Sequence, residues 1–273
     1  MLSLQTGPSG LSYVVGITCA LAASLDSARS ESDRISSAAN YCLSYRNSVT
    51  ISDDHTILCF DGKIDLDQAS APFHQLKQNG FFIVRSPGGA PHVAINLSNI
   101  LRKKNATVII YDYCLSACAN YFLIASFKTY ILKSSIVAWH GGPPKVGCNA
   151  GNIEHVKKYL RDWRYVRDRD GIEIYPSAEV LCQTIELEKR FFKEREIEDR
   201  HIHQPQTEHT QTMTHFAMIE PANRRRVLWM WNPKNYGDYF KSRIVYESYP
   251  SSQDEVDEIL SRLQLGIRVI YDP

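Results

Sequence analysis

A serine and a histidine in this 273-residue chain have the types and the spacing that nucleophilic catalysis needs. Ser116 lies in the stretch YDYCLSACANYF, between a β-type run and small residues that begin a helix, and His140 ends the run SIVAWH 24 residues later. A serine hydroxyl is a poor nucleophile until a base takes its proton, and histidine is the usual base near neutral pH. The pair therefore predicts covalent chemistry on a carbonyl group, although a serine at a helix start is in isolation a helix cap.

A second turn offers the hydrogen-bond donors that such chemistry needs. In the run SPGG, residues 86–89, the two glycines allow the backbone to approach a substrate closely. Unpaired N–H groups at a helix start can hold a developing oxyanion, and Ala117 supplies one directly after the serine. We predict an oxyanion hole built from the N–H groups of Gly88 and Ala117, with Gly89 as a further donor. SPGG alone would also fit an ordinary tight turn.

Alternating strands and helices must place these two turns side by side. The β-type runs, one of them broken by a turn at Asp53 and Asp54, alternate with helical runs, and this pattern predicts an α/β fold. The serine and its oxyanion donors then fall at one end of a sheet. Strands are expected at 48–60, 81–86, 106–113, 128–133 and 135–140, and helices at 65–78, 92–104 and 117–127.

The rest of the domain is expected to add a helical region at about 152–215. Two charged, aromatic-rich helices are predicted over 152–200, followed by a loop with four histidines over 201–215. That loop offers no rigid spacing for ligands, so no metal site is predicted. A final αβ portion at 222–271 contains a capped helix, SSQDEVDEILSRL, and the strand GIRVIY.

The N-terminal sequence favours export. Residues 11–25 form an apolar run too short to span a bilayer comfortably, and Ala20-Leu21-Ala22 matches the cleavage pattern of a secretory signal. We predict a signal peptide or leader at 1–25, a lead-in at 26–47 and the main domain at 48–273, in a periplasmic or secreted protein. The first ten residues carry no positive charge, so a cytoplasmic protein or an N-terminal membrane anchor stays open.

The cysteines agree with export. Cys114 and Cys118 flank the serine closely enough to form a disulfide, and an even number of cysteines in an exported protein permits such bridges. Small buried thiols are the alternative. Six cysteines remain after the leader: Cys42, Cys59, Cys114, Cys118, Cys148 and Cys182.

These features together resemble the ClpP/crotonase superfamily. SPGG is followed by a helix, a strand leading to C-x-S-A-C, and a strand that ends in histidine, over about residues 55–145. The likeness is to predicted periplasmic ClpP-like serine hydrolases. It implies a repeated ββα spiral with an added helical region, and a serine peptidase that works without a cofactor. Ser116 would attack a peptide or ester bond and form an acyl-enzyme, with His140 as the base.

The sequence departs from the ClpP pattern at the third catalytic residue, which is an aspartate in ClpP. The corresponding stretch, NRRRVLWMWNPKNYG, has arginines where the acid is expected, and Glu186, Glu188 and Glu220 are the alternatives. Either a Ser–His dyad is active, or the protein is an inactive binding or scaffold protein with this fold. Crotonase-type acyl-CoA enzymes usually employ carboxylates, so the serine and the histidine argue against that activity.

Few partners are predicted beyond a substrate. The net charge of +1 gives no electrostatic footprint for nucleic acid. The sequence has no recognisable surface for an unfoldase, and an exported protein would meet no ATP-driven unfoldase. Superfamily members commonly form trimers or larger rings, so the resemblance implies self-association.

Overall fold

The computed structural model describes residues 31–46, 49–141, 178–198, 202, 208–219, 227–236, 240 and 243–273. The chain divides into two compact units after Ser44. In the first unit residues 31–43, within the lead-in predicted at 26–47, form a helix. Its buried apolar side chains recur at helical spacing, which the serine-rich composition obscured. They are Ile35, Ala38, Ala39 and Cys42. The predicted leader at 1–25 lies outside the described residues.

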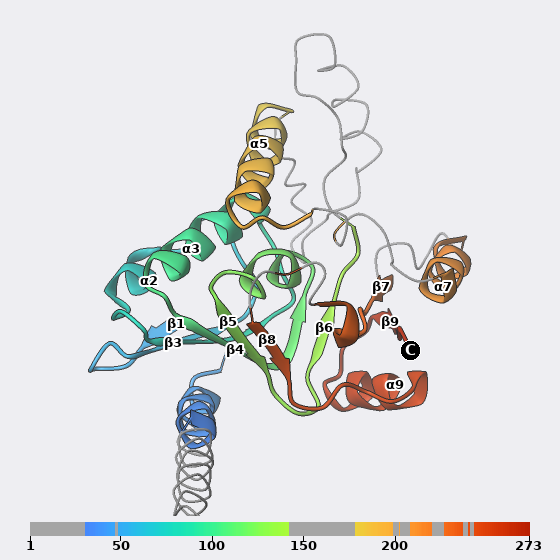
Figure 1. The fold of residues 1–273 in the computed structure, drawn as a ribbon, viewed down its shortest axis with the longest axis horizontal. Coiled ribbons are helices and arrows are strands. Elements are labelled where there is room, and N and C mark those ends of the chain that lie inside the picture. The colour runs from blue at the N-terminus through green and yellow to red at the C-terminus, as the bar shows by residue number, and fades with distance from the viewer. Residues whose placement is uncertain are drawn as a thin grey trace, which may run out of the picture. The chain divides into compact units, whose positions relative to one another are not determined.

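The second unit is an α/β fold around a mostly parallel sheet, which confirms the predicted fold class at this level (Figure 1). Seven of the described strands form this sheet in the order β1-β2-β3-β4-β5-β8, and β6 also pairs with β4. Strand β1 runs antiparallel to β2, and the other pairs are parallel. The bounds are β1 Val49–Ile51, β2 Ile57–Asp61, β3 Phe81–Ser86, β4 Thr107–Leu115, β5 Lys128–Ile131, β6 Ile136–Ala138 and β8 Arg243–Tyr246.

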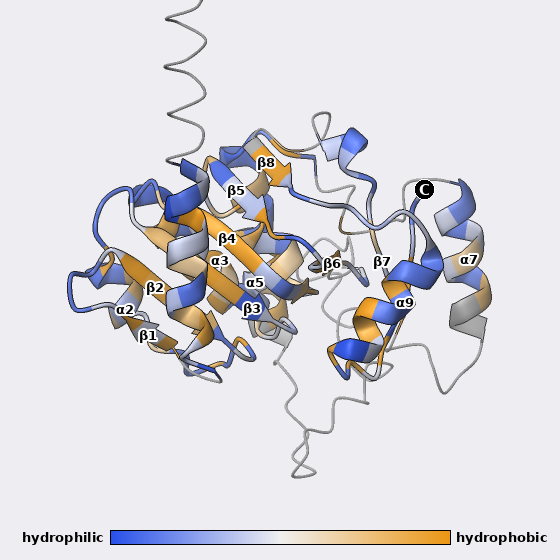
Figure 2. Ribbon diagram, turned by 90° about the horizontal axis from the view of Figure 1, so that it is seen from below, coloured by the Kyte–Doolittle hydropathy of each residue, from blue (hydrophilic) through white to orange (hydrophobic). Residues whose placement is uncertain are grey.

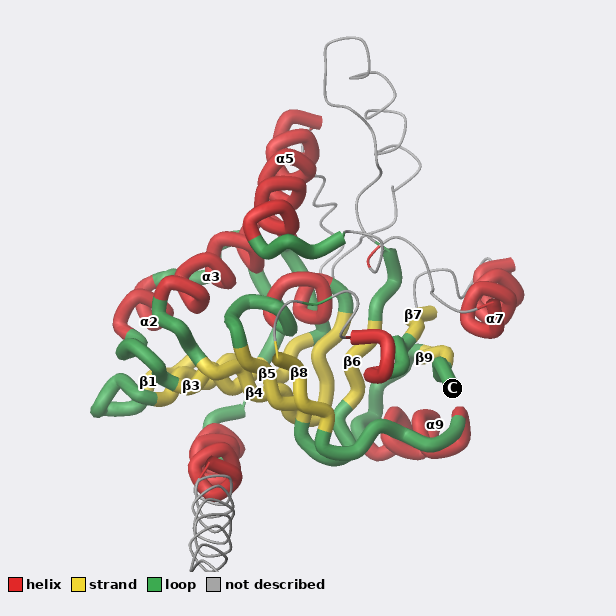
Figure 3. The backbone as a smooth tube through the Cα atoms, viewed as in Figure 1, coloured by secondary structure: helices red, strands yellow, loops and turns green. Residues whose placement is uncertain are grey.

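Helices form the connections that parallel strands require. Helix α2 (Ala71–Gln75) connects β2 with β3, α3 (Pro91–Lys103) connects β3 with β4, and the π-helix η1 (Cys118–Phe122) connects β4 with β5. Helices α2, α3 and α5 (Ala178–Glu194) lie on one side of the sheet (Figure 3). The second helix predicted within 152–200 corresponds to α5, and the first lies outside the described residues.

The hydrophobic core lies between these helices and the sheet. The central strands are largely apolar, with polar residues toward their ends (Figure 2), as expected for buried parallel strands. Four phenylalanine rings from β2, α2, β3 and η1 pack with centroids 5.1 to 6.3 Å apart, mostly edge to face. They are Phe60, Phe73, Phe82 and Phe122. Through Phe122, this cluster packs η1, which follows the candidate nucleophile, against strands β2 and β3.

Local sequence explains where α3 begins and ends. Pro91 occupies the first turn, where its missing N–H costs nothing, and Arg102 and Lys103 in the last turn face the negative end of the helix dipole. Val93, Ala94, Leu97, Ser98 and Leu101 form its buried face at helical spacing.

A smaller two-stranded sheet completes the described part of the unit. It pairs β7 (Val227–Trp229) with β9 (Arg268–Ile270), and α9 (Gln253–Arg262) and α7 (Glu208–Ile219) pack on it. A short 3-10 helix, η2 (Pro233–Asn235), follows β7. The loop predicted over 201–215 is therefore wrong from residue 208 onward, where Thr210 and Thr214 are buried on one side of a helix.

Two predicted helices of the main domain are shorter in the structure. The helix expected over 65–78 is reduced to α2, because Pro72 in its first turn cannot continue an earlier helical run. The helix expected over 117–127 is the five-residue π-helix η1 followed by turns. The strand expected to end at His140 ends at Ala138, and Trp139 continues as an isolated bridge to Trp229.

Candidate active site

Ser116 lies at the junction where β4 ends and η1 begins. Its N–H donates to the Ala138 carbonyl at 3.0 Å, and its own carbonyl accepts from the Asn120 N–H at 2.9 Å. Its backbone φ of 56° falls in the left-handed region, which non-glycine residues seldom adopt and which is enriched at active sites. Ala117 is the N-cap of η1 and no side chain caps that helix, so Ser116 does not act as a helix cap.

His140 reaches Ser116 because their two strands are neighbours. Strands β4 and β6 run parallel, with Leu115 opposite Ala138, so the residues that follow each strand emerge at the same edge of the sheet. Trp139 exchanges backbone hydrogen bonds with Trp229 at 2.9 and 2.7 Å, which holds the chain just before the histidine. The Ser116 Oγ and His140 Nε2 atoms lie 2.5 Å apart, within hydrogen-bond distance.

The surroundings of His140 favour its neutral form. His140 is exposed to solvent, yet the protein atoms near its ring still desolvate it. This desolvation lowers the pKa of His140 below the ordinary value of 6.5, and a hydrogen bond between the ring and its own backbone opposes the shift. A neutral imidazole at neutral pH can accept the proton of the Ser116 hydroxyl, which is the task of a general base.

The glycine turn packs directly against the serine junction. A Cβ on Gly88 would lie 2.7 Å from the Leu115 carbonyl oxygen and 2.9 Å from the Ala117 nitrogen, and the φ of Gly88 is 91°. Ile64 holds the turn from the other side, because its N–H donates to the Gly88 carbonyl at 2.9 Å. Only glycine therefore allows this close approach.

The three predicted oxyanion donors differ in their hydrogen bonds. The Gly88 N–H donates to the Ser86 hydroxyl at 3.1 Å, an acceptor that the sequence did not reveal. The Gly89 and Ala117 N–H groups have no hydrogen-bond partner among the described residues. Ala117 lies beside the nucleophile and offers its donor without rearrangement, whereas Gly88 must share its donor or give up the bond to Ser86.

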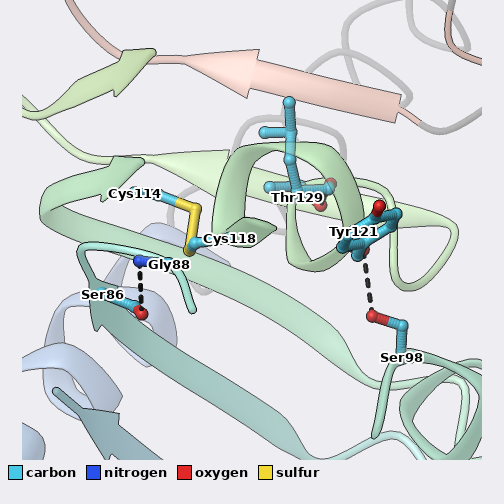
Figure 4. Close-up of a disulfide and its surroundings, with 8 residues drawn as sticks. Ser86, Gly88, Ser98, Cys114, Cys118, Tyr121 and Thr129 are labelled. Carbon is cyan, nitrogen blue, oxygen red and sulfur yellow. Dashed lines mark hydrogen bonds between the residues drawn. A yellow bond between two sulfur atoms is a disulfide. The ribbon is translucent and has the colours of Figure 1, made fainter. Parts of the chain in front are cut away.

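A disulfide joins Cys114 and Cys118 across the serine junction, at a Cα–Cα distance of 5.2 Å (Figure 4). Both cysteines are fully buried. Cys114 lies opposite Ser86 in the pairing of β3 and β4, so the bridge lies near the Ser86–Gly88 hydrogen bond (Figure 4). Cys42, Cys59 and Cys182 are also disulfide-bonded, whereas Cys148 lies outside the described residues. The alternative of free thiols is therefore wrong for these five cysteines.

Buried hydrogen bonds hold η1 against its neighbours. The Ser98 hydroxyl of α3 donates to the Tyr121 carbonyl at 3.1 Å, and the Tyr121 hydroxyl donates to Glu188 of α5. Arg195, just after α5, donates to the Ile124 carbonyl at 3.3 Å. Burial and the nearby carboxylate raise the pKa of Tyr121, so its hydroxyl stays protonated and remains a donor.

No described carboxylate completes a triad with His140. Its hydrogen bonds among the described residues are those to Ser116 and to its own backbone. Glu188 binds Tyr121, and Glu186 forms an exposed ion pair with Lys189 at 2.7 Å. Two of the three acids suggested by the sequence therefore serve other partners, and the third, Glu220, lies outside the described residues.

Neither a metal-binding group of side chains nor a membrane-spanning helix occurs among the described residues. No group of three histidine, cysteine, aspartate or glutamate side chains among the described residues is placed to hold a metal ion. Within the same part of the chain no helix combines the length and the apolar character that crossing a bilayer needs.

In comparisons with known proteins, no family model and no curated protein matches this sequence.

Proposed function

We propose that this protein is a serine hydrolase in which Ser116 and His140 form a catalytic dyad. The observation that carries the proposal is the 2.5 Å separation of Ser116 Oγ and His140 Nε2 at a left-handed strand-to-helix junction. Nucleophile and base within hydrogen-bond reach are the signature of activated serine chemistry. The Ala117 N–H beside the serine, which has no hydrogen-bond partner among the described residues, adds the means to stabilise an oxyanion.

The reaction would proceed through an acyl-enzyme. Ser116 Oγ attacks the substrate carbonyl carbon while its proton passes to His140 Nε2, and the carbonyl oxygen becomes an oxyanion held by the Ala117 N–H and a glycine N–H. The intermediate collapses, and the leaving amine or alcohol takes the proton from His140. Water then gives a proton to His140 as its oxygen attacks the acyl carbon. The second tetrahedral intermediate collapses, the acid is released, and His140 returns the proton to Ser116 Oγ. No cofactor takes part in these steps.

We also propose that the fold is ClpP/crotonase-like, with a repeated ββα spiral, and that the protein is an exported peptidase. Supporting features are the parallel strands β2 to β5, the glycine turn after β3 and the serine after β4. Disulfides persist in oxidising compartments, and the bonded cysteines fit a periplasmic or secreted location. By analogy with that superfamily, we expect self-association.

One observation favours a second function, that of an inactive binding or scaffold protein. His140 has no carboxylate partner among the described residues, so nothing there stabilises the imidazolium that forms when it takes a proton.

Pre-steady-state hydrolysis of an activated ester separates the two functions. A hydrolase that forms an acyl-enzyme should release a burst of alcohol stoichiometric with protein, followed by slower turnover. The Ser116→Ala variant should show no burst. A folded wild-type protein without a burst, toward ester and peptide substrates alike, would favour the binding protein.

A further inference from the structure

We propose that Arg85, Asp61 and Asp112 are positioning residues for the nucleophile: one guanidinium clamps a bulge in β4 that aims Ser116 toward His140. The inference rests on the proposed function of that pair. None of the three residues touches the reacting atoms.

The bulge lies where β4 changes neighbours. As far as Ile110, β4 pairs with β5, and from Tyr113 onward it pairs with β6. On its other side Val84 lies opposite Ile110, whereas Ser86 lies opposite Cys114, so a step of two residues in β3 matches a step of four in β4. Bulges bend a strand and re-aim the side chains beyond them. The nucleophile follows two residues after Cys114.

The side chain of Asp112 anchors this bulge to the next strands. Asp112 has a left-handed φ of 56°, which the surrounding structure must stabilise. Its Oδ2 accepts from Arg85 Nη1 at 3.0 Å. Arg85 also donates to both carboxylate oxygens of Asp61, from Nε at 2.8 Å and from Nη2 at 2.6 Å. One side chain of β3 therefore joins β2 to the bulge of β4.

This network is shielded enough to be strong. The side chains of Asp61 and Arg85 are 2% and 11% exposed, and that of Asp112 is 28% exposed. Bidentate, partly buried pairs of this kind are stronger than surface ion pairs. The guanidinium also lies 5.5 Å from the ring centre of Tyr111 and 5.8 Å from that of Tyr113, the residues on either side of Asp112. The hydrogen bonds with Asp61 raise the pKa of Arg85, so it remains a cation.

The clamp and the left-handed backbone make separable contributions, and substitutions at Asp112 distinguish them. Asp112→Gly removes the carboxylate but accepts a positive φ. Asp112→Ala removes the carboxylate and also disfavours the positive φ. Asp112→Asn keeps an acceptor and tolerates the left-handed region. Arg85→Lys keeps the charge but not the bidentate geometry. The control Lys189→Ala removes an exposed ion pair with Glu186.

The experiment measures the rate of covalent labelling of Ser116 by a fluorophosphonate, together with hydrogen exchange over residues 111–122 and over α9. Labelling should slow about 10- to 100-fold in Asp112→Ala, Asp112→Gly and Arg85→Lys, as expected for small misplacements of a catalytic group. Exchange over 111–122 should rise while exchange over α9 stays at the wild-type rate. Asp112→Asn should be intermediate, and Lys189→Ala should match the wild type.

Three results would overturn the inference. The first is wild-type labelling and exchange in Asp112→Ala and Arg85→Lys. The second is wild-type behaviour of Asp112→Gly, which would assign the effect to the backbone alone. The third is equal acceleration of exchange in α9, which would indicate general destabilisation. If the wild type is not labelled, the proposed hydrolase function fails, while hydrogen exchange still tests the positioning of the junction.

Discussion

The Ser116 hydroxyl and the His140 imidazole lie 2.5 Å apart although 24 residues separate them in the chain. The parallel pairing of β4 with β6 produces this contact, because it brings the ends of both strands to one edge of the sheet. The glycine turn after β3 reaches the same edge and packs on the serine junction.

The pH dependence of labelling should report the His140 base. Desolvation lowers the pKa of His140 below 6.5, and only the neutral ring can take the serine proton. The labelling rate should therefore be constant at neutral pH and fall with acidification, with a midpoint below pH 6.5. A midpoint well above this value would indicate a carboxylate partner for the histidine.

Substitution of Gly88 should disrupt the site through steric overlap. In Gly88→Ala the new Cβ would lie 2.8 Å from Ser116 Cβ, at a φ of 91° that alanine rarely adopts. We expect a loss of about 2 kcal/mol or more in the free energy of unfolding, and a large loss of labelling. Urea denaturation measures the first quantity.

Gly266→Ala is the matched control, because its Cβ would meet no atom within 4 Å. It should leave both measurements close to those of the wild type. Equal effects of the two substitutions would contradict a specific role for the close approach at Gly88.

Removal of the Cys114–Cys118 disulfide should loosen the serine junction. The bridge closes a five-residue loop, and the chain-entropy relation gives about 2 kcal/mol of stabilisation for a loop of this size. The double variant Cys114→Ala, Cys118→Ala should lose about that much stability and should be labelled more slowly. Unchanged unfolding and labelling would show that the bridge does not hold the junction.

Parts of this site follow from the sequence because they depend on local pattern. The junction at Ser116, the SPGG turn and the strand leading to His140 are each visible as a change from β-type to helical or glycine-rich sequence. The parallel pairing of neighbouring strands then brings the Ser116 junction, the SPGG turn and His140 to one edge of the sheet. The Cys114–Cys118 bridge also follows, because its spacing is short.

Other parts depend on contacts between distant segments and could not be predicted. The bulge at Asp112 requires Arg85 from the neighbouring strand, and nothing in YDY marks it. The helix at 208–219 is obscured by its many polar residues, yet tertiary packing buries Thr210 and Thr214. The bond from Gly88 to Ser86 depends on the side-chain rotamer of the serine.

Covalent labelling of the folded protein with a fluorophosphonate, followed by peptide mass spectrometry, tests the central claim most directly. The Ser116–His140 dyad predicts one modified residue, Ser116, and no labelling in Ser116→Ala. His140→Ala should lose the labelling as well while keeping its fold, because the base is gone. Absence of labelling at every pH in folded wild-type protein, or equal labelling in Ser116→Ala, would contradict the dyad.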